Sequence, residues 1–242
     1  NFVIIALLAG FGATPLIAAQ KIEAYTDRKS YVAGDTISFY VSTDSPTYHI
    51  EIVRDGLVPQ TVASGPDLPG TLRPSAPNGW LGPNWPLSHT WVVPAGWATG
   101  SYFARFITTD ATVHLHPFAI RPTTPGSSSR IAFCLDYNTR NAYNFWGGAS
   151  LYTGFPPAVK VSFQRPFAAE NGLGKGSFLP PQCHGRIELE GYPLEYITEW
   201  DIHQNPSILQ AYDIVIWSAH QEYNSRQFFD AIQAHHDRGG HL

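Results

Sequence analysis

The chain has 242 residues, of which 43% are hydrophobic, 14% aromatic and only 14% charged. This composition is typical of a folded globular protein and excludes an intrinsically disordered one. A net charge of -4 gives no electrostatic reason to expect a nucleic-acid partner. The two cysteines, Cys134 and Cys183, are too few for a disulfide framework or a cysteine-based zinc site. We expect Cys134 to be a small buried hydrophobe rather than half of a bridge.

The N-terminal segment is apolar over residues 2–19 and ends in small residues. This pattern favours a secretory signal peptide over residues 1–19, with a first strand or a lipid-facing helix as the alternatives. The run is short for a membrane span, which needs about 20 continuous apolar residues. We therefore expect an exported protein (secreted, periplasmic or at the cell surface) with no membrane association after signal removal. Without a signal peptide the protein would be cytoplasmic. The sequence has the appearance of a fragment at both ends.

Residues 20–122 show short apolar runs separated by turn signals such as Ala33-Gly34-Asp35 and Arg54-Asp55-Gly56. This pattern predicts an all-β region, organised as an immunoglobulin-like β-sandwich without its usual disulfide. His114 and His116 would share one face of the last strand, and we expect that face to be solvated. Strands are expected at residues 37–41, 48–53, 90–93, 101–106 and 113–120.

Residues 123–129, with the sequence TTPGSSS, are a linker by composition. After the linker, residues 130–242 alternate strands with helical stretches, which predicts a parallel, doubly wound sheet. The expected strands are residues 131–135, 194–198 and 213–217, and a helix is expected over residues 225–238, capped by Ser225.

Polar side chains follow each of these strands, at the edge where open α/β sheets bind ligands. After the first strand comes a polar and aromatic segment that ends in Gly147-Gly148. Asp201 follows the second strand, and His220 and Glu222 follow the third. A histidine and a glutamate two residues apart can bind a metal or move a proton, or can simply cap a helix. Ser218 lacks the flanking glycines of a nucleophile elbow, which disfavours a serine hydrolase.

Five blocks in this half resemble one protein family in their order and spacing. They are NAYNFWGGASLY, VSFQRPF, GYPLEYITEWDIH, AHQEY and RGG. Together they are similar to the large (beta) subunit of N,N-dimethylformamidase and its relatives. The blocks TGSYFARF and HPFAIRP in the first half look like the domain that precedes them. The resemblance implies an amidotransferase-like, that is flavodoxin-like, doubly wound domain that is incomplete at its C-terminus.

The resemblance also implies a site. Family members hold a mononuclear ferric iron with two tyrosines and a glutamate, which by motif are Tyr102, Tyr143 and Glu222, and His220 would be the catalytic proton-handling group. Ala219 and Asn224 depart from the family pattern, where glycine and tryptophan are usual. The family's remaining polar active-site residues, a glutamate among them, would lie beyond Leu242. The substrate pocket is expected to include Asn144, Phe145, Trp146, Asp201 and Tyr223.

The function implied is iron-dependent hydrolysis of the C–N bond in a small amide. Two phenolates and a carboxylate are hard anionic ligands that suit ferric iron. A zinc or other metal hydrolase on the same fold is one alternative, and a non-enzymatic exported binding or surface module is the other. The resemblance further allows a small partner subunit and a homo-oligomer.

Overall fold

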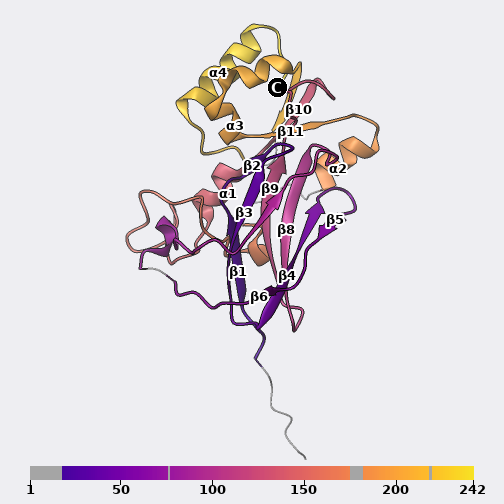
Figure 1. The fold of residues 1–242 in the computed structure, drawn as a ribbon. Coiled ribbons are helices and arrows are strands. Elements are labelled where there is room, and N and C mark those ends of the chain that lie inside the picture. The colour runs from indigo at the N-terminus through magenta and orange to yellow at the C-terminus, as the bar shows by residue number, and fades with distance from the viewer. Residues whose placement is uncertain (1–17, 76, 175–181, 218–219) are drawn as a thin grey trace, which may run out of the picture.

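The computed structural model describes residues 18–75, 77–174, 182–217 and 220–242. Two β-sheets pack face to face in one half, and a parallel sheet with helices forms the other half (Figure 1). The chain is therefore a mixed α/β protein dominated by β-structure. The expected signal peptide, residues 1–19, lies almost entirely outside the described residues.

The first half is a β-sandwich. One sheet has the order β1-β3-β7 and the other the order β2-β9-β8-β4-β5, with β6 paired to β4. Alternate residues of facing strands, such as Phe39 and Phe106, are fully buried and meet in one core, as the period of two of a strand requires. The strands are β1 (Ile22–Thr26), β2 (Ser30–Tyr31), β3 (Thr36–Thr43), β4 (Thr47–Arg54), β5 (Gln60–Ser64), β6 (Leu68–Pro69), β7 (His89–Val92), β8 (Gly100–Thr108) and β9 (Val113–Ile120).

Strand β9 differs from the sequence-based expectation. His114 and His116 are buried, so the prediction of a solvated face is wrong. The ring of His116 stacks on Phe167 and its Nε2 contacts Lys29 Nζ, while His114 Nε2 lies 3.2 Å from the carbonyl oxygen of Ala24. The face is covered by a segment about 50 residues further along the chain, which strand periodicity does not reveal.

The second half contains a three-stranded parallel sheet in the order β11-β10-β12, which confirms the three expected strands. Buried side chains of α3, η3 and α4 cover one face of the sheet, and the other face packs against β9 and α2. Ser225 caps α4 by accepting from Phe228 N, as predicted. The elements are β10 (Ile131–Leu135), α1 (Tyr137–Tyr143), α2 (Gln182–Leu189), β11 (Glu195–Thr198), α3 (Glu199–Gln204), β12 (Ile214–Trp217) and α4 (Arg226–Asp237), with the 3-10 helices η1 (Gly79–Leu81), η2 (Glu170–Gly172) and η3 (Pro206–Ala211).

The segment 123–129 between the halves is anchored, although its composition is that of a linker. The buried carboxylate of Glu195 accepts hydrogen bonds from the backbone N–H of Gly126 and of Ser128, both at 2.7 Å, and from the hydroxyl of Tyr212 at 2.8 Å. Burial alone would raise the pKa of Glu195, but these donors outweigh it and the pKa is lowered. The connecting segment is therefore fixed to the second half.

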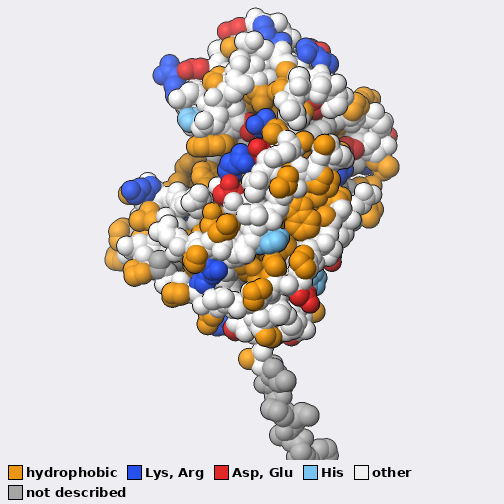
Figure 2. All heavy atoms as spheres, viewed as in Figure 1, with side chains coloured by type: hydrophobic (Ala, Val, Ile, Leu, Met, Phe, Trp, Pro, Cys, Tyr) orange, Lys and Arg blue, Asp and Glu red, His pale blue; other side chains and the backbone are white. Residues whose placement is uncertain are grey.

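Both cysteines are free thiols, and Cys134 is buried in β10 as expected. Among the described residues, no helix has the length and apolar character needed to cross a membrane. Hydrophobic side chains remain exposed over the sandwich and on the lobe beside it (Figure 2). Leu81 of η1 is about half exposed, and the loop residues Phe155 and Val159 are fully exposed.

Candidate functional site

Two tyrosines and a glutamate converge beyond the carboxyl ends of the parallel strands. The hydroxyl of Tyr143 donates to Glu222 Oε2 at 3.0 Å, and the hydroxyl of Tyr152 donates to Glu222 Oε1 at 2.5 Å. The two phenol rings stack with centroids 4.1 Å apart. We call these three residues the tyrosine–glutamate cluster. His220 belongs to its edge, with Nε2 3.6 Å from Glu222 Oε2.

Helix α1 holds the segment that carries Glu222. Thr139 Oγ1 accepts from the backbone N–H of Glu222 at 2.9 Å, and Asn138 Nδ2 donates to the carbonyl oxygen of Tyr223 at 2.8 Å. Because Tyr143 is the last residue of the same helix, one short helix positions both sides of the cluster.

A glycine turn brings Tyr152 back over Tyr143. Gly147 and Gly148 have φ of +82° and +96°, which favours glycine. A Cβ on Gly147 would lie 2.3 Å from the backbone of Gly79, so the close approach of the two loops also requires a residue without a side chain.

The buried guanidinium of Arg165 binds backbone carbonyl oxygens of the same loop. It donates to the carbonyl oxygens of Trp146 at 2.8 Å, Asn141 at 2.9 Å and Ala149 at 3.3 Å. Its planar fork of donors suits several acceptors arranged around it. The loop between the two tyrosines is therefore fixed by a residue from the VSFQRPF block.

The groups around Glu222 favour its ionised, negatively charged form. The hydrogen bond from Tyr152 is the main reason why the pKa of Glu222 is lowered, and Tyr143 and His220 act in the same direction. Loss of solvation, together with the neighbouring Glu222 carboxylate, raises the pKa of Tyr152. Tyr152 therefore donates to the carboxylate as a neutral phenol, and a bound cation would be needed to form its phenolate.

Tyr102, the third ligand implied by the resemblance, is not brought to this cluster. Its ring is buried in the sandwich core, stacked between Trp97 and Phe118. Its hydroxyl donates to the carbonyl oxygen of Ala98 at 2.7 Å. The set Tyr102, Tyr143 and Glu222 is therefore not assembled in this structure, because β8 turns this side chain inward as one of its alternating core residues.

Some of the residues expected to line the substrate pocket lie at the cluster, and others have structural contacts elsewhere. Asn144 and Trp146 are buried and structural, since Asn144 bonds the backbone of neighbouring segments and Trp146 Nε1 donates to Glu23 Oε1 at 2.8 Å. Asp201 completes the capping box of α3 and pairs with an arginine. Phe145 is half exposed. Tyr223 is placed at the site, with its ring edge-on to Tyr152 at 6.0 Å.

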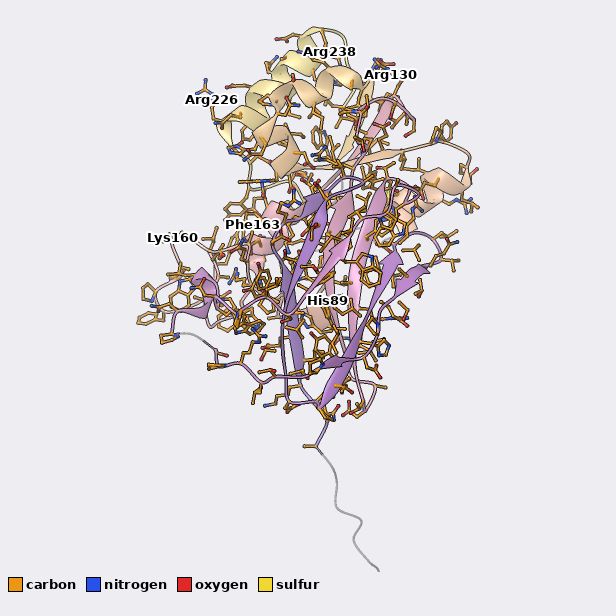
Figure 3. The ribbon with its side chains drawn as sticks, viewed as in Figure 1. His89, Arg130, Lys160, Phe163, Arg226 and Arg238 are labelled. Carbon is orange, nitrogen blue, oxygen red and sulfur yellow. The ribbon has the colours of Figure 1, made fainter. Side chains whose placement is uncertain are left out.

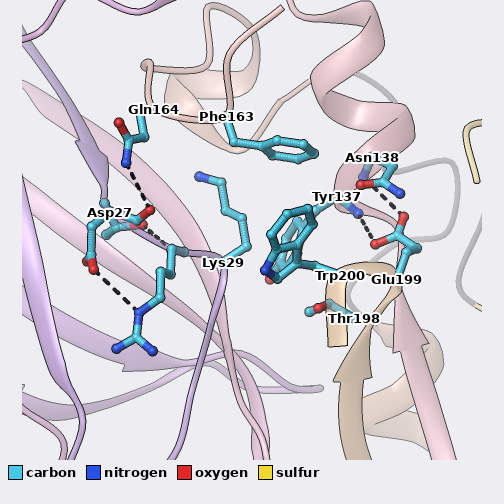
Figure 4. A pocket seen from close by; sticks show the side chains of 11 residues that line it. Asp27, Lys29, Tyr137, Asn138, Phe163, Gln164, Thr198, Glu199 and Trp200 are labelled. Carbon is cyan, nitrogen blue, oxygen red and sulfur yellow. Dashed lines mark hydrogen bonds and ion pairs between the residues drawn. The ribbon is translucent and has the colours of Figure 1, made fainter. Parts of the chain in front are cut away.

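A cavity of about 220 Å³ lies between the turn after β1 and the ends of β10 and β11 (Figure 4). Phe163 and Trp200 extend their rings into it. The carboxylate of Glu199 accepts from the backbone N–H groups of Tyr137 and Asn138, both at 3.1 Å. Burial raises the pKa of Glu199 to about 8, against the opposing effect of these hydrogen bonds. Glu199 thus anchors the first turn of α1, whose far end carries the cluster.

Tyr152 is the site residue that sequence reasoning missed. It lies within the quoted GASLY block, nine positions after Tyr143. The available signal was the Gly147-Gly148 pair, which indicates that the chain can reverse between the two tyrosines. Nothing in the sequence shows that the two rings stack.

Most of the chain matches a known protein family. Residues 53–242 match the family described as N,N-dimethylformamidase beta subunit-like, C-terminal. No curated protein matches the chain.

Three solved structures are similar over part of the chain. Escherichia coli alpha-2-macroglobulin activated by porcine elastase is 14% identical over 46% of this chain and 9% of that chain, with a TM-score of 0.33. The sporulation control protein Spo0M from Bacillus subtilis is 11% identical over 44% of this chain and 50% of that chain, with a TM-score of 0.30. A Paenibacillus sp. cycloisomaltooligosaccharide glucanotransferase complexed with cycloisomaltoheptaose is 14% identical over 48% of this chain and 16% of that chain, with a TM-score of 0.28. The aligned part thus covers half or less of each of these chains. TM-scores of this size support no inference about fold or function.

Proposed function

The chain belongs to the N,N-dimethylformamidase beta subunit-like family, and from this premise we propose that it hydrolyses the C–N bond of a small amide at the tyrosine–glutamate cluster. The observation that carries the proposal is the convergence of Tyr143, Tyr152 and Glu222 on one another, with His220 at their edge. The two phenols and the carboxylate come from segments up to 79 positions apart.

The donors of the cluster fit ferric iron. They are two phenol oxygens and a carboxylate, all hard oxygen ligands, and the carboxylate is already favoured in its ionised form. Bound there, ferric iron would supply the positive charge that favours phenolates and polarises an amide carbonyl. Tyr143, Tyr152 and Glu222 would hold it, so Tyr152 takes the place that the resemblance gave to Tyr102.

The remaining roles belong to protein side chains. His220 is about half exposed and lies beside Glu222, where it can accept the proton of the attacking water and return it to the departing amine. The hydrolysis then balances, because one water adds across the C–N bond and gives an acid and an amine. Tyr223 forms an aromatic wall next to Tyr152.

The strand order of the parallel sheet supports a proposal about the fold. The order β11-β10-β12 corresponds to the first three strands of a flavodoxin-like sheet, in which the second strand lies on one side of the first and the third on the other. We propose that residues 130–242 are the start of such a domain and that residues 20–122 are an immunoglobulin-like sandwich. We also propose export through the segment 1–19 and association with a small partner subunit.

The two alternatives have less support. Among the described residues, no group of three or more His, Cys, Asp or Glu is placed to hold a metal, whereas zinc prefers nitrogen and sulfur ligands. A purely binding module would not require the ionised Glu222 to be surrounded by two phenol donors and a histidine.

The experiment is a visible absorption spectrum with metal analysis of the aerobically purified protein. We expect a broad phenolate-to-iron band and about one iron per chain. Tyr143→Phe and Tyr152→Phe should each weaken or shift the band, whereas Tyr102→Phe should leave it unchanged. A protein that binds no iron when iron is supplied, and that releases no amine from formamides, would refute the proposal.

A further inference from the structure

A groove of about 350 Å³ lies beside the tyrosine–glutamate cluster. Its walls are largely apolar and include Ala142, Leu151, Val161, Phe163 and Tyr223. Figure 3 shows Phe163 nearer the sheets and Lys160 further out. Ligand sites commonly combine such apolar walls with a few placed polar groups.

Three of the chain segments that line the groove also carry the cluster. Ala142 precedes Tyr143, Leu151 precedes Tyr152, and Tyr223 follows Glu222. The backbone N–H of Leu151 donates to the carbonyl oxygen of Ala142 at 3.0 Å, which ties two of these segments together. The Tyr223 ring both lines the groove and meets the Tyr152 ring, so it is a wall common to the groove and the cluster.

Asn224, one of the residues that line the groove, has a buried acceptor without a hydrogen-bond donor among the described residues. Asn224 Nδ2 donates to the carbonyl oxygen of Gln221 at 3.0 Å. The acceptor atom of the same side-chain amide is Oδ1. That oxygen is buried, and no described residue donates a hydrogen bond to it. A buried acceptor of this kind favours a ligand that brings an N–H group.

Charge restricts the ligand further. Lys160 is the charged residue among those that line the groove. A cationic substituent would be repelled by its ammonium, and the apolar walls favour an uncharged chain.

We propose that this groove binds the apolar substituent of a secondary amide, with the amide N–H donated to Asn224 Oδ1 and the carbonyl directed to the tyrosine–glutamate cluster. The inference rests on the proposed function of that cluster. It names a substrate class: uncharged secondary amides with a substituent of several carbons, in preference to small or N,N-dialkylated amides. A formamide with only methyl groups would leave most of the groove empty.

The test is a binding series, measured by calorimetry on the purified protein so that it does not depend on turnover. N-pentylformamide should bind at least tenfold more tightly than N-methylformamide. N-methyl-N-pentylformamide, which lacks the N–H, should bind about fivefold more weakly than N-pentylformamide. N-(5-aminopentyl)formamide should also lose most of the advantage of the chain.

Three variants identify the groove as the source of these ratios. Asn224→Leu should abolish the preference for the secondary amide, and Val161→Trp should abolish the preference for the longer chain. Val92→Trp, on an exposed position of β7 outside the groove, is the matched control and should keep both ratios. Thermal melts of each variant verify that it is folded.

The outcomes separate this inference from the proposed function. Release of amine from N-methylformamide without any chain preference would overturn the groove assignment and leave the function standing. Groove-dependent binding of N-pentylformamide without hydrolysis of any amide would support the groove and refute the function. Equal ratios in Asn224→Leu, Val161→Trp and the unaltered protein would also overturn the assignment.

Discussion

At the scale of single residues, the surroundings of a tyrosine hydroxyl decide whether it can serve chemistry. The hydroxyl of the buried Tyr102 donates to the backbone carbonyl of Ala98, whereas those of Tyr143 and Tyr152 donate to a partly exposed carboxylate. The first arrangement contributes to stability, and the second gathers groups that can change their charge.

Tyr102→Phe therefore tests the assignment directly. We expect a loss of about 1 kcal/mol in the free energy of unfolding, because the hydrogen bond from the Tyr102 hydroxyl to the carbonyl oxygen of Ala98 is lost. Iron content and activity should be unchanged. Urea denaturation and metal analysis provide the two measurements, and loss of iron in a variant of normal stability would restore Tyr102 as a ligand.

His114 predicts a second residue-scale effect, on acid stability. Burial lowers its pKa from 6.5 to about 4, and the neighbouring buried groups His116 and Lys29 also have lowered pKa values. Between pH 6.5 and 4 the unfolded chain takes up a proton at His114 that the folded chain does not. Stability should therefore fall as the pH decreases through this window, by roughly 3 kcal/mol from His114 alone.

The measurement for this effect is urea denaturation at pH values from 7 to 4. His114→Gln should flatten the dependence, since glutamine does not titrate in this range. An unchanged slope in a folded His114→Gln protein would show that the acid sensitivity arises elsewhere.

At the scale of elements, the loop between Tyr143 and Tyr152 depends on Arg165. The guanidinium binds the carbonyl oxygens of Trp146 before the glycine turn and of Ala149 after it, although burial lowers the pKa of Arg165 to about 10. The cost of burying this cation is offset by several charge-assisted hydrogen bonds. One side chain thus fixes the loop that carries the second phenol.

Arg165→Met should cost about 3 kcal/mol or more in the free energy of unfolding, because several buried carbonyl oxygens lose their donors. Arg165→Lys should recover only part of this, since a single ammonium lacks the planar fork of donors. Urea denaturation measures stability, and near-ultraviolet circular dichroism monitors the packing of the aromatic side chains. Normal stability of Arg165→Met would show that the loop is held by other contacts.

At the scale of the whole molecule, the two halves share buried contacts. Trp146 packs with Trp85 and Tyr25 of the sandwich half and donates to Glu23, while Ala119 of β9 joins the core beneath Phe133. Glu195 also fixes the connecting residues 126–129 to the second half. Such ties predict that the halves unfold together.

Calorimetry of the intact chain should therefore show one transition. Trp146→Ala should lower the free energy of unfolding by about 3–5 kcal/mol, as expected for a large aromatic side chain removed from a core. Trp200→Ala, at a half-exposed tryptophan, is a matched control and should cost less. Two resolved transitions in the unaltered protein would contradict this coupling.

Local patterns in the sequence were sufficient to predict the secondary elements with strong periodicity and to reveal the motifs that place the chain in its family. Strands β3, β4 and β8–β12 and helix α4 follow from patterns of apolar residues and caps, which are local properties. The family resemblance implied site roles for Tyr143, Glu222 and His220, which the structure places near one another. It did not identify α1, whose polar sequence lacks an apolar stripe.

Only the tertiary structure decided which side chains meet. Burial of His114 and His116, the inward position of Tyr102 and the stacking of Tyr152 on Tyr143 depend on segments tens of residues away in the chain. Strand and helix periods specify the face of an element on which a residue lies, but not what covers that face. The tyrosine–glutamate cluster therefore became visible only when the glycine turn and Arg165 brought the loop back onto α1.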